Sequence, residues 1–335
     1  MCRPALAGWW EDDKPGRMAA QSPSPSGRYR AFGLRLQSAL PLPELHPDDD
    51  ATGPVDVQVR PAAAPPPGAP EIVPGVRADA CRFWMEVPRS GRFLARDGCE
   101  MVVERHADAT DGDVRAYLLG SVMGALLHQR GLLPLHASAV AVNGRAVAFI
   151  APAGHGKSTM AMHLQHRGHR VICDDICAVA IEDGSARVWP GLRNLKLWRA
   201  SLGAIARTPD GLEPVLVDMD KYRVPLDASA GAMDAGCAVT LAAVVLLDWG
   251  DDLTITALPG AEAVGALVAN TFRGQLVAPM GRQAAHWRQC LDLFGGAGVY
   301  RLVRPRALDR LDAVSALVER FAADATAGGH VGVST

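Results

Sequence analysis

The stretch that decides the fold reads RAVAFIAPAGHGKST and runs from Arg145 to Thr159. Residues 145–150 are almost all apolar, as in a buried strand, and residues 151–156 are small and contain two glycines. The following residues, 160–167, read as a helix that Gly168 ends. The pattern predicts a strand, a tight loop and a helix in direct succession.

This order is typical of a phosphate-binding loop (P-loop). Small residues let several backbone N–H groups point at one phosphate group, and the helix adds the positive end of its dipole. Lys157 would bridge the β- and γ-phosphates of a nucleotide, and the hydroxyl of Ser158 would bind Mg²⁺. The usual motif begins with Gly where this chain has Ala151, which costs little if φ is negative there. A glycine-rich turn with a solvated lysine is the alternative. The predicted nucleotide-binding residues of this stretch are Ala153, Gly154, His155, Gly156, Lys157, Ser158 and Thr159.

Two adjacent acids, Asp174 and Asp175, follow the short apolar segment 170–173. A carboxylate at the end of a neighbouring strand can hold Mg²⁺, and a second one can accept the proton of an attacking hydroxyl. Two adjacent acids repel each other, which raises one pKa and suits a base. The alternative is an Asp-Asp turn between strands.

Several other polar residues are candidates for the same site. His136 lies in the segment 133–142, which we expect to form one strand with His136, Ser138 and Val140 on one face. Cations around a transferred phosphoryl group favour phosphoryl transfer. The basic candidates, in segments 192–198 and 220–225, are Arg193, Lys196, Lys221 and Arg223. A structural histidine and a solvated basic surface remain the alternatives.

Composition restricts the class of protein. The chain has 335 residues, a hydrophobic fraction of 49% and a formal net charge of −2, so a general nucleic-acid binder is not expected. It contains no run of about 18 apolar residues, so we expect no membrane span. Seven cysteines without a CxxC pair predict reduced, mostly buried thiols in a cytoplasmic protein.

The chain divides into four expected parts. Residues 1–27 and 324–335 are predicted to be disordered or frayed tails. Residues 28–110 are expected to form a β-rich domain, with strands in 29–36, 55–59, 92–95 and 101–104 and a Pro/Ala linker at 61–70. Residues 111–323 would form the P-loop domain, and its other expected elements are helices at 114–129, 261–272, 282–294 and 308–321, and strands at 176–181, 186–189, 240–248, 253–258 and 299–303. Asn143-Gly144 predicts a tight hairpin turn into the strand 145–150.

Three blocks of sequence resemble the catalytic core of HPr serine kinase/phosphorylase. They are LHASAV (135–140), GHGKS (154–158) and RGHRVICDD (167–175). The resemblance implies an α/β fold with the P-loop core shared with phosphoenolpyruvate carboxykinases, together with ATP and Mg²⁺ as cofactors. It implies that Lys157 and Ser158 bind phosphate and metal, that Asp174 and Asp175 supply the metal contact and the base, and that His136 tunes the base. Which aspartate has which role stays open.

The plan of residues 29–320 looks more like the HPr-kinase-like proteins of lasso-peptide gene clusters. The resembling parts are the opening Tyr29-x-x-Phe32-Gly33-Leu34, the stretch LLPLHA (132–137) and Asn270-Thr271-Phe272-Arg273. The resemblance implies a serine kinase acting on a peptide or small protein, with the C-terminal serine of a lasso-peptide precursor as acceptor. Nucleic acid and membrane are not expected partners, and a homo-oligomer is left open.

Two other functions remain open. Ala151 and the absence of the family's glutamate-bearing signature after the aspartates favour a nucleotide-gated peptide-binding protein without chemistry. A small-molecule kinase is the third interpretation.

Overall fold

The computed structural model describes residues 27–50, 52–182, 184–203, 207–216, 219–226 and 233–326. They form a mixed α/β structure with three sheets. The predicted tails therefore fall almost entirely outside the described residues. Gly27 already begins the first strand, and the last helix continues to Thr326, so both predicted boundaries need correction.

The first sheet is built from residues 27–105 and has the strand order β3-β1-β2-β4-β9-β8-β7-β6-β5. Buried and less buried residues alternate along β2, β4 and β8, so one face of these strands is buried, as in β8, where Phe93 and Ala95 are inaccessible. Three of the four expected strand segments correspond to β4, β8 and β9. The expected strand at 29–36 is instead a hairpin of β1 and β2, because the chain turns at Phe32 and Gly33, and β3, β5, β6 and β7 were not predicted. The strands are β1 (Gly27–Ala31), β2 (Leu34–Ser38), β3 (His46–Pro47), β4 (Val57–Pro61), β5 (Glu71–Val73), β6 (Val76–Ala78), β7 (Arg82–Val87), β8 (Gly91–Arg96) and β9 (Glu100–Arg105).

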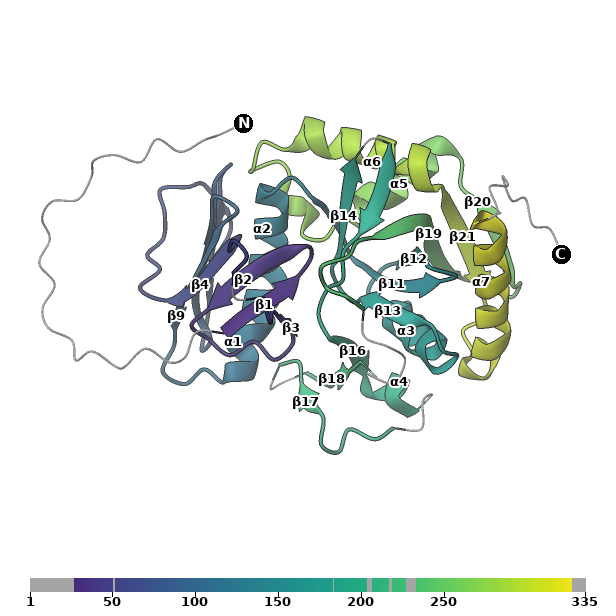
Figure 1. The fold of residues 1–335 in the computed structure, drawn as a ribbon, viewed down its shortest axis with the longest axis horizontal. Helices are drawn as coiled ribbons and strands as arrows, with labels where there is room; N and C mark the ends of the chain where they lie inside the picture. The colour runs from purple at the N-terminus through teal and green to yellow at the C-terminus, as the bar shows by residue number, and fades with distance from the viewer. Residues whose placement is uncertain are drawn as a thin grey trace, which may run out of the picture.

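A long helix follows and covers this sheet (Figure 1). It consists of α1 (Asp111–Tyr117), one π-helical segment (Leu118–Val122) and α2 (Met123–Gln129). The side chain of Thr110 caps its first turn, and Gly131, with a φ of +81°, follows its end. The helix predicted for 114–129 is thus confirmed. Its apolar residues share a core with the N-terminal strands, although the sequence suggested a domain boundary at residues 110–111.

The second sheet carries the 145–159 stretch. Its strands are β10 (Leu133–Leu135), β11 (Ala137–Val142), β12 (Arg145–Ile150), β13 (Arg170–Cys173), β14 (Cys177–Glu182), β15 (Ser185–Val188), β19 (Val239–Trp249), β20 (Thr254–Ala257) and β21 (Val299–Arg304). The turn between β11 and β12 has positive φ at Asn143 and Gly144, as predicted. The prediction of a single strand at 133–142 is wrong, because β10 pairs with β14 whereas β11 pairs with β12 and β13.

Strand direction brings distant residues to one edge of this sheet. β19 is parallel to β12, and β21 is parallel to β19. β13 is antiparallel to β11, which is itself antiparallel to β12, so β13 also runs in the direction of β12. The carboxyl ends of β12, β13, β19 and β21 therefore lie at the same edge, where α/β sheets bind ligands.

Helices cover both faces of the second sheet (Figure 1). Val140 and Val147 lie in one core with α3 and α7, whereas Ala139 and Ala148 lie in another core with α5 and α6. Successive side chains of β11 and β12 thus point alternately into two apolar cores, one on each face of the sheet. The helices are α3 (Lys157–His166), α5 (Gly260–Ala269), α6 (Gln283–Ala297) and α7 (Leu311–Thr326), with short 3₁₀ turns at Gly274–Leu276 and Leu308–Arg310.

The two basic segments form a third, small sheet of order β16-β18-β17. Its strands are β16 (Asn194–Trp198), β17 (Glu213–Pro214) and β18 (Lys221–Pro225), and α4 (Arg199–Gly203) follows β16. Lys196 pairs with Arg223, and Trp198 pairs with Lys221. Segments that are about 25 residues apart in the sequence are therefore neighbours.

The tip of the β1–β2 hairpin joins the first sheet to the second. Phe32 and Gly33 both have positive φ, and the Phe32 N–H donates to the carbonyl of Pro190 at 2.7 Å. A Cβ on Gly191 would lie 3.0 Å from the Phe32 ring and 2.9 Å from the Cβ of Cys173. The hairpin tip thus packs directly behind the end of β13.

The thiols differ from the prediction. Cys173, Cys177 and Cys290 are buried, but Cys81, Cys99 and Cys237 are exposed. For the six described cysteines the expectation of mostly buried thiols is therefore wrong, because three lie on turns and bends at the surface, and Cys2 lies outside the described residues. None of the helices in the described residues has the length and apolar character required to span a membrane.

A buried histidine generates a prediction about pH and stability. The Nε2–H of His128 in α2 donates to the carbonyl of Phe272 at 2.8 Å, and burial lowers the pKa of His128 to about 4. The unfolded chain binds this proton near pH 6.5, so its contribution to stability is present above pH 6.5 and is lost as the pH falls towards 4. We expect the free energy of unfolding to lose about 3 kcal/mol from this group across that range.

The measurement is urea unfolding between pH 7 and 4. His128→Gln keeps a donor for the Phe272 carbonyl and removes the titration, so its unfolding free energy should fall less steeply with acid. His106→Gln is the control, because the His106 side chain is 52% exposed. Equal slopes for His128→Gln and the unsubstituted protein would contradict the prediction.

Candidate active site

The loop between β12 and α3 forms one wall of a pocket. Gly154 and Gly156 have φ values of +82° and +78°, which favour glycine. Gly156 is the residue before α3, and no side chain caps the helix start, which leaves N–H groups of the first turn available to an anion. Ala151 does not have positive φ, so its replacement of the usual glycine creates no backbone strain.

Lys157 lies over this loop and is buried. Its ammonium donates to the carbonyl of Ala151 at 2.7 Å and to that of Pro152 at 3.3 Å. Burial lowers the pKa of Lys157 to about 8, although the carboxylates of Asp174 and Asp175 act in the opposite direction. The side chain is long enough to exchange these carbonyls for a more negative partner.

Asp174 connects three elements through one carboxylate. Its Oδ1 accepts hydrogen bonds from Ser138 Oγ of β11 at 2.6 Å and from Ser158 Oγ of α3 at 2.8 Å. Its Oδ2 accepts from the backbone N–H of Lys196 in β16 at 2.8 Å. The residue is buried, so these bonds offset the desolvation of its charge.

Asp175 points to a different side. It has a φ of +71°, and the Ile176 N–H donates to the Asp174 carbonyl across it at 2.9 Å, as in a γ-turn. Positive φ at a residue with a side chain is strained and is found at functional sites. Its Oδ2 forms an ion pair with Lys196 Nζ at 2.6 Å, and its Oδ1 lies 3.4 Å from His136 Nδ1.

These contacts correct one sequence-based expectation. Burial by itself would raise the pKa of Asp175, but the Lys196 ammonium and the His136 imidazole hold this pKa well below its ordinary value. The expectation that repulsion between the acids would raise a pKa is therefore wrong for Asp175. The two carboxylates are directed apart, and a cation next to Asp175 outweighs its neighbour.

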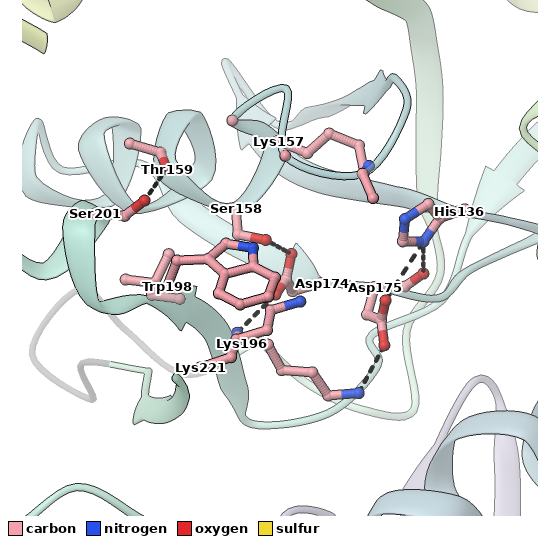
Figure 2. A pocket seen from close by; sticks show the side chains of 14 residues that line it. His136, Lys157, Ser158, Thr159, Asp174, Asp175, Lys196, Trp198, Ser201 and Lys221 are labelled. Carbon is pink, nitrogen blue, oxygen red and sulfur yellow. Dashed lines mark hydrogen bonds and ion pairs between the residues drawn. The ribbon is translucent and has the colours of Figure 1, made fainter. Parts of the chain in front are cut away.

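The pocket gathers most of the predicted site residues. Figure 2 shows Ser158 facing Asp174, and His136 beside Asp175. The predicted residues that line the pocket are His136, Ala153, Gly154, Gly156, Lys157, Ser158, Thr159, Asp174, Asp175, Lys196 and Lys221. His136 lies at the break between β10 and β11, where its N–H donates to the Asn270 carbonyl at 2.7 Å.

Three predicted residues do not line the pocket. The ring of His155 stacks on Trp249 with centroids 5.8 Å apart. Arg193 is exposed, and its backbone pairs with Glu44 and Leu226. Arg223 is buried and serves a structural role through bonds to the carbonyls of Gly112, Pro214 and Val215 and ion pairs with Glu213 and Glu44.

The sequence-based interpretation missed several residues of the pocket. Ser138 was placed on the correct face, but its bond to Asp174 was not predicted. Trp198, Leu197 and Ser201 also line the pocket, and Ser201 Oγ lies 3.0 Å from Thr159 Oγ1. The signal for Trp198 was its place beside Lys196, because a strand residue two positions away shares the same face.

The donor set is suited to one kind of metal. Within the described part of the chain, no three His, Cys, Asp or Glu side chains gather as a metal-holding group. The hydroxyl of Ser158 and the carboxylate of Asp174 are hard oxygen ligands in direct contact. This set fits Mg²⁺, which takes few protein ligands and completes its shell with water and substrate phosphates.

The chain is similar to known proteins in structure, but it matches no known family by sequence. No protein-family model matches the chain, and no curated protein matches it either. Among solved structures, the chain is similar to the HPr(Ser) kinase/phosphatase from Coxiella burnetii, with 11% identity and a TM-score of 0.34. The match covers 58% of this chain and 99% of that chain. A TM-score this low does not establish a common fold, and the roles of the site residues rest on their own geometry.

The ion pair between Lys196 and Asp175 in the pocket wall gives a prediction about stability. The side chains of Lys196 and Asp175 are only 10% and 18% exposed. Removing one charge leaves the other desolvated and unpaired, so Asp175→Asn should lower the free energy of unfolding by about 3 kcal/mol.

A double-mutant cycle measures the coupling. The free energy of unfolding in urea is measured for Asp175→Asn, Lys196→Met and the double variant. The decrease in the double variant should be clearly smaller than the sum of the decreases in the two single variants. The Arg199–Asp220 pair, with side chains 56% and 55% exposed, is the control and should show little or no coupling. Additive losses at Lys196 and Asp175 would show that the pair is not coupled.

Proposed function

We propose that the protein is an ATP-dependent kinase that transfers the γ-phosphoryl group to a serine hydroxyl of a peptide or protein. One observation carries this proposal. The contact between Ser158 and Asp174 joins the start of α3 to the two acids, with Lys157 and Asp175 lining the same pocket. In P-loop enzymes that transfer phosphoryl groups, the loop hydroxyl and a nearby aspartate hold Mg²⁺ together.

The 151–158 loop would bind the triphosphate. The ammonium of Lys157 would leave the carbonyls of Ala151 and Pro152 for the β- and γ-phosphates, which are stronger partners. Ser158 and Asp174 would hold Mg²⁺, which neutralises charge on the phosphates during transfer. Lys221 lies on the pocket wall with its ammonium over the Trp198 ring at 5.8 Å, and adds positive charge there.

Asp175 would act on the acceptor. Its depressed pKa keeps it ionised, so it can accept a hydrogen bond from the serine hydroxyl and orient its oxygen towards the γ-phosphorus. As the new O–P bond forms, the bond to the β–γ bridging oxygen breaks, ADP leaves, and the hydroxyl proton passes by way of Asp175 to water, because a carboxylate with a depressed pKa does not retain it. Lys196 and His136 would hold the carboxylate in position.

The acceptor class rests on sequence resemblance. The motifs shared with lasso-peptide-associated kinases support a peptide acceptor, specifically the C-terminal serine of a precursor peptide. A non-catalytic, nucleotide-gated peptide-binding protein is the second candidate, because the closed ion pair between Asp175 and Lys196 would also suit a site that performs no chemistry. A small-molecule kinase differs from the proposal only in the acceptor.

Mass spectrometry tests the proposed reaction. Purified protein is incubated with Mg-ATP and a precursor peptide that ends in serine, and the peptide should gain the mass of one phosphate. Asp174→Asn and Asp175→Asn should each abolish this gain. A folded protein that binds ATP and phosphorylates neither peptides nor a panel of small hydroxyl compounds would support the non-catalytic alternative instead.

The role of Lys157 gives a quantitative prediction. Lys157→Ala should remove about 3 kcal/mol of transition-state stabilisation, which lowers kcat/KM by a factor of about 150. The measurement is initial rates with varied ATP. His166→Ala on the exposed side of α3 is the control and should retain the unsubstituted rate. Unchanged turnover in Lys157→Ala would refute the assigned role.

A further inference from the structure

A buried arginine lies behind the 151–158 loop and plays no part in the chemistry described so far. Arg304 is the last residue of β21, and its residue surface is only 4% exposed. Its guanidinium donates through Nη2 to the carbonyl of His155 at 2.6 Å. A Cβ on Gly156 would lie 2.8 Å from the same Nη2, so the guanidinium lies against the loop backbone.

The charge of Arg304 has no counter-ion in the part of the chain that the structure describes. No described carboxylate acts on its charge, and the buried Nε has no hydrogen-bond partner. Burial lowers the pKa of Arg304 to about 10. A desolvated cation without a counter-ion costs free energy, and perturbed charges of this kind are concentrated at functional sites.

Neighbouring side chains fix the position of this guanidinium. Arg304 and Trp249 are register partners at the ends of β21 and β19, and the guanidinium lies 4.0 Å from the centre of the Trp249 ring. The imidazole of His155 stacks on the same indole. Cation–π contact and stacking together hold Arg304 against residues 155–156.

The hydrogen bond has a geometric consequence for the loop. In a trans peptide the carbonyl and the following N–H point in opposite directions. With the His155 carbonyl held towards Arg304, the N–H of Gly156 points away from Arg304. The bond to a charged donor also polarises this peptide group, which makes its N–H a stronger donor.

We infer that Arg304 is a positioning residue for the nucleotide phosphates, which acts through the 155–156 peptide and supplies the loop with a buried positive charge. This inference rests on the proposed nucleotide-binding function. The ligand group that fits best is a polyphosphate, because the attraction of the guanidinium and the oriented N–H for an anion grows with the charge of the anion. The carboxyl ends of β12, β19 and β21 supply this part of the site together.

Nucleotide binding in variants tests the inference. Dissociation constants for Mg-ATP, Mg-ADP and AMP are measured by calorimetry for the unsubstituted protein, Arg304→Met and Arg304→Lys. Arg304→Met should weaken ATP binding about ten- to a hundredfold, with smaller losses for ADP and the smallest for AMP, because the attraction grows with ligand charge. Arg304→Lys should recover part of the loss. Arg306→Met is the control. Arg306 is exposed, and its guanidinium lies 5.9 Å from the centre of the same Trp249 ring.

Each outcome decides between roles. If Arg304→Met weakens the binding of ATP, ADP and AMP by the same factor, Arg304 has only a structural role and the inference is overturned. Unchanged ATP affinity in a folded Arg304→Met would also overturn it. If Arg304→Met does not fold, Arg304→Lys and Trp249→Leu take its place, and the same dependence on phosphate number is expected of them. If the unsubstituted protein binds none of the three nucleotides, the proposed function is contradicted as well. If it binds them and the Arg304 variants bind them equally well, only this inference is contradicted.

Discussion

The buried carboxylate of Asp174 is the interaction on which the site depends. It accepts hydrogen bonds from β11, from the first turn of α3 and from the backbone of β16. An anion in this environment is tolerated only when each of these donors is in place. The loop, the central sheet and the small basic sheet are therefore held in one arrangement by a single group.

Asp175 shows how two adjacent acids can serve different purposes. The γ-turn at Asp175 directs the second side chain away from the first, towards Lys196 and His136. The strain of that turn is the local cost of separating the two carboxylates. The result is one acid surrounded by hydroxyl and amide donors and another neutralised by a cation, in a pocket that both share.

Local sequence determined much of this fold. The strand, loop and helix at 145–166 follow from apolar runs and small residues, and the Asn143-Gly144 turn follows from its need for positive φ. The convergence of Asp174 on Ser158 could also be predicted, because both follow strands that run in one direction. The first two features depend on contacts or periodicities within a few residues, whereas the convergence of Asp174 on Ser158 depends on the directions of β12 and β13.

Features that depend on distant partners could not be predicted in the same way. The predicted strand is interrupted at His136 because β10 and β11 pair with different strands. Arg223 looked like a site residue, but Glu44 and Gly112, more than 100 positions away, hold it elsewhere. Predicting that the pKa of Asp175 is lowered requires knowing that Lys196 lies beside it, and no spacing in the sequence reveals this.

The packing at the β1–β2 hairpin tip has a consequence for how this chain can vary. Gly191 separates the Phe32 ring from Cys173, and the residue after Cys173 is Asp174. A methyl group at position 191 would displace either the hairpin or the end of β13, and so the carboxylate that β13 presents. Volume alone should therefore restrict residue 191 to glycine. A larger residue there would lower activity as the loss of a site residue does, although residue 191 contacts no reactant.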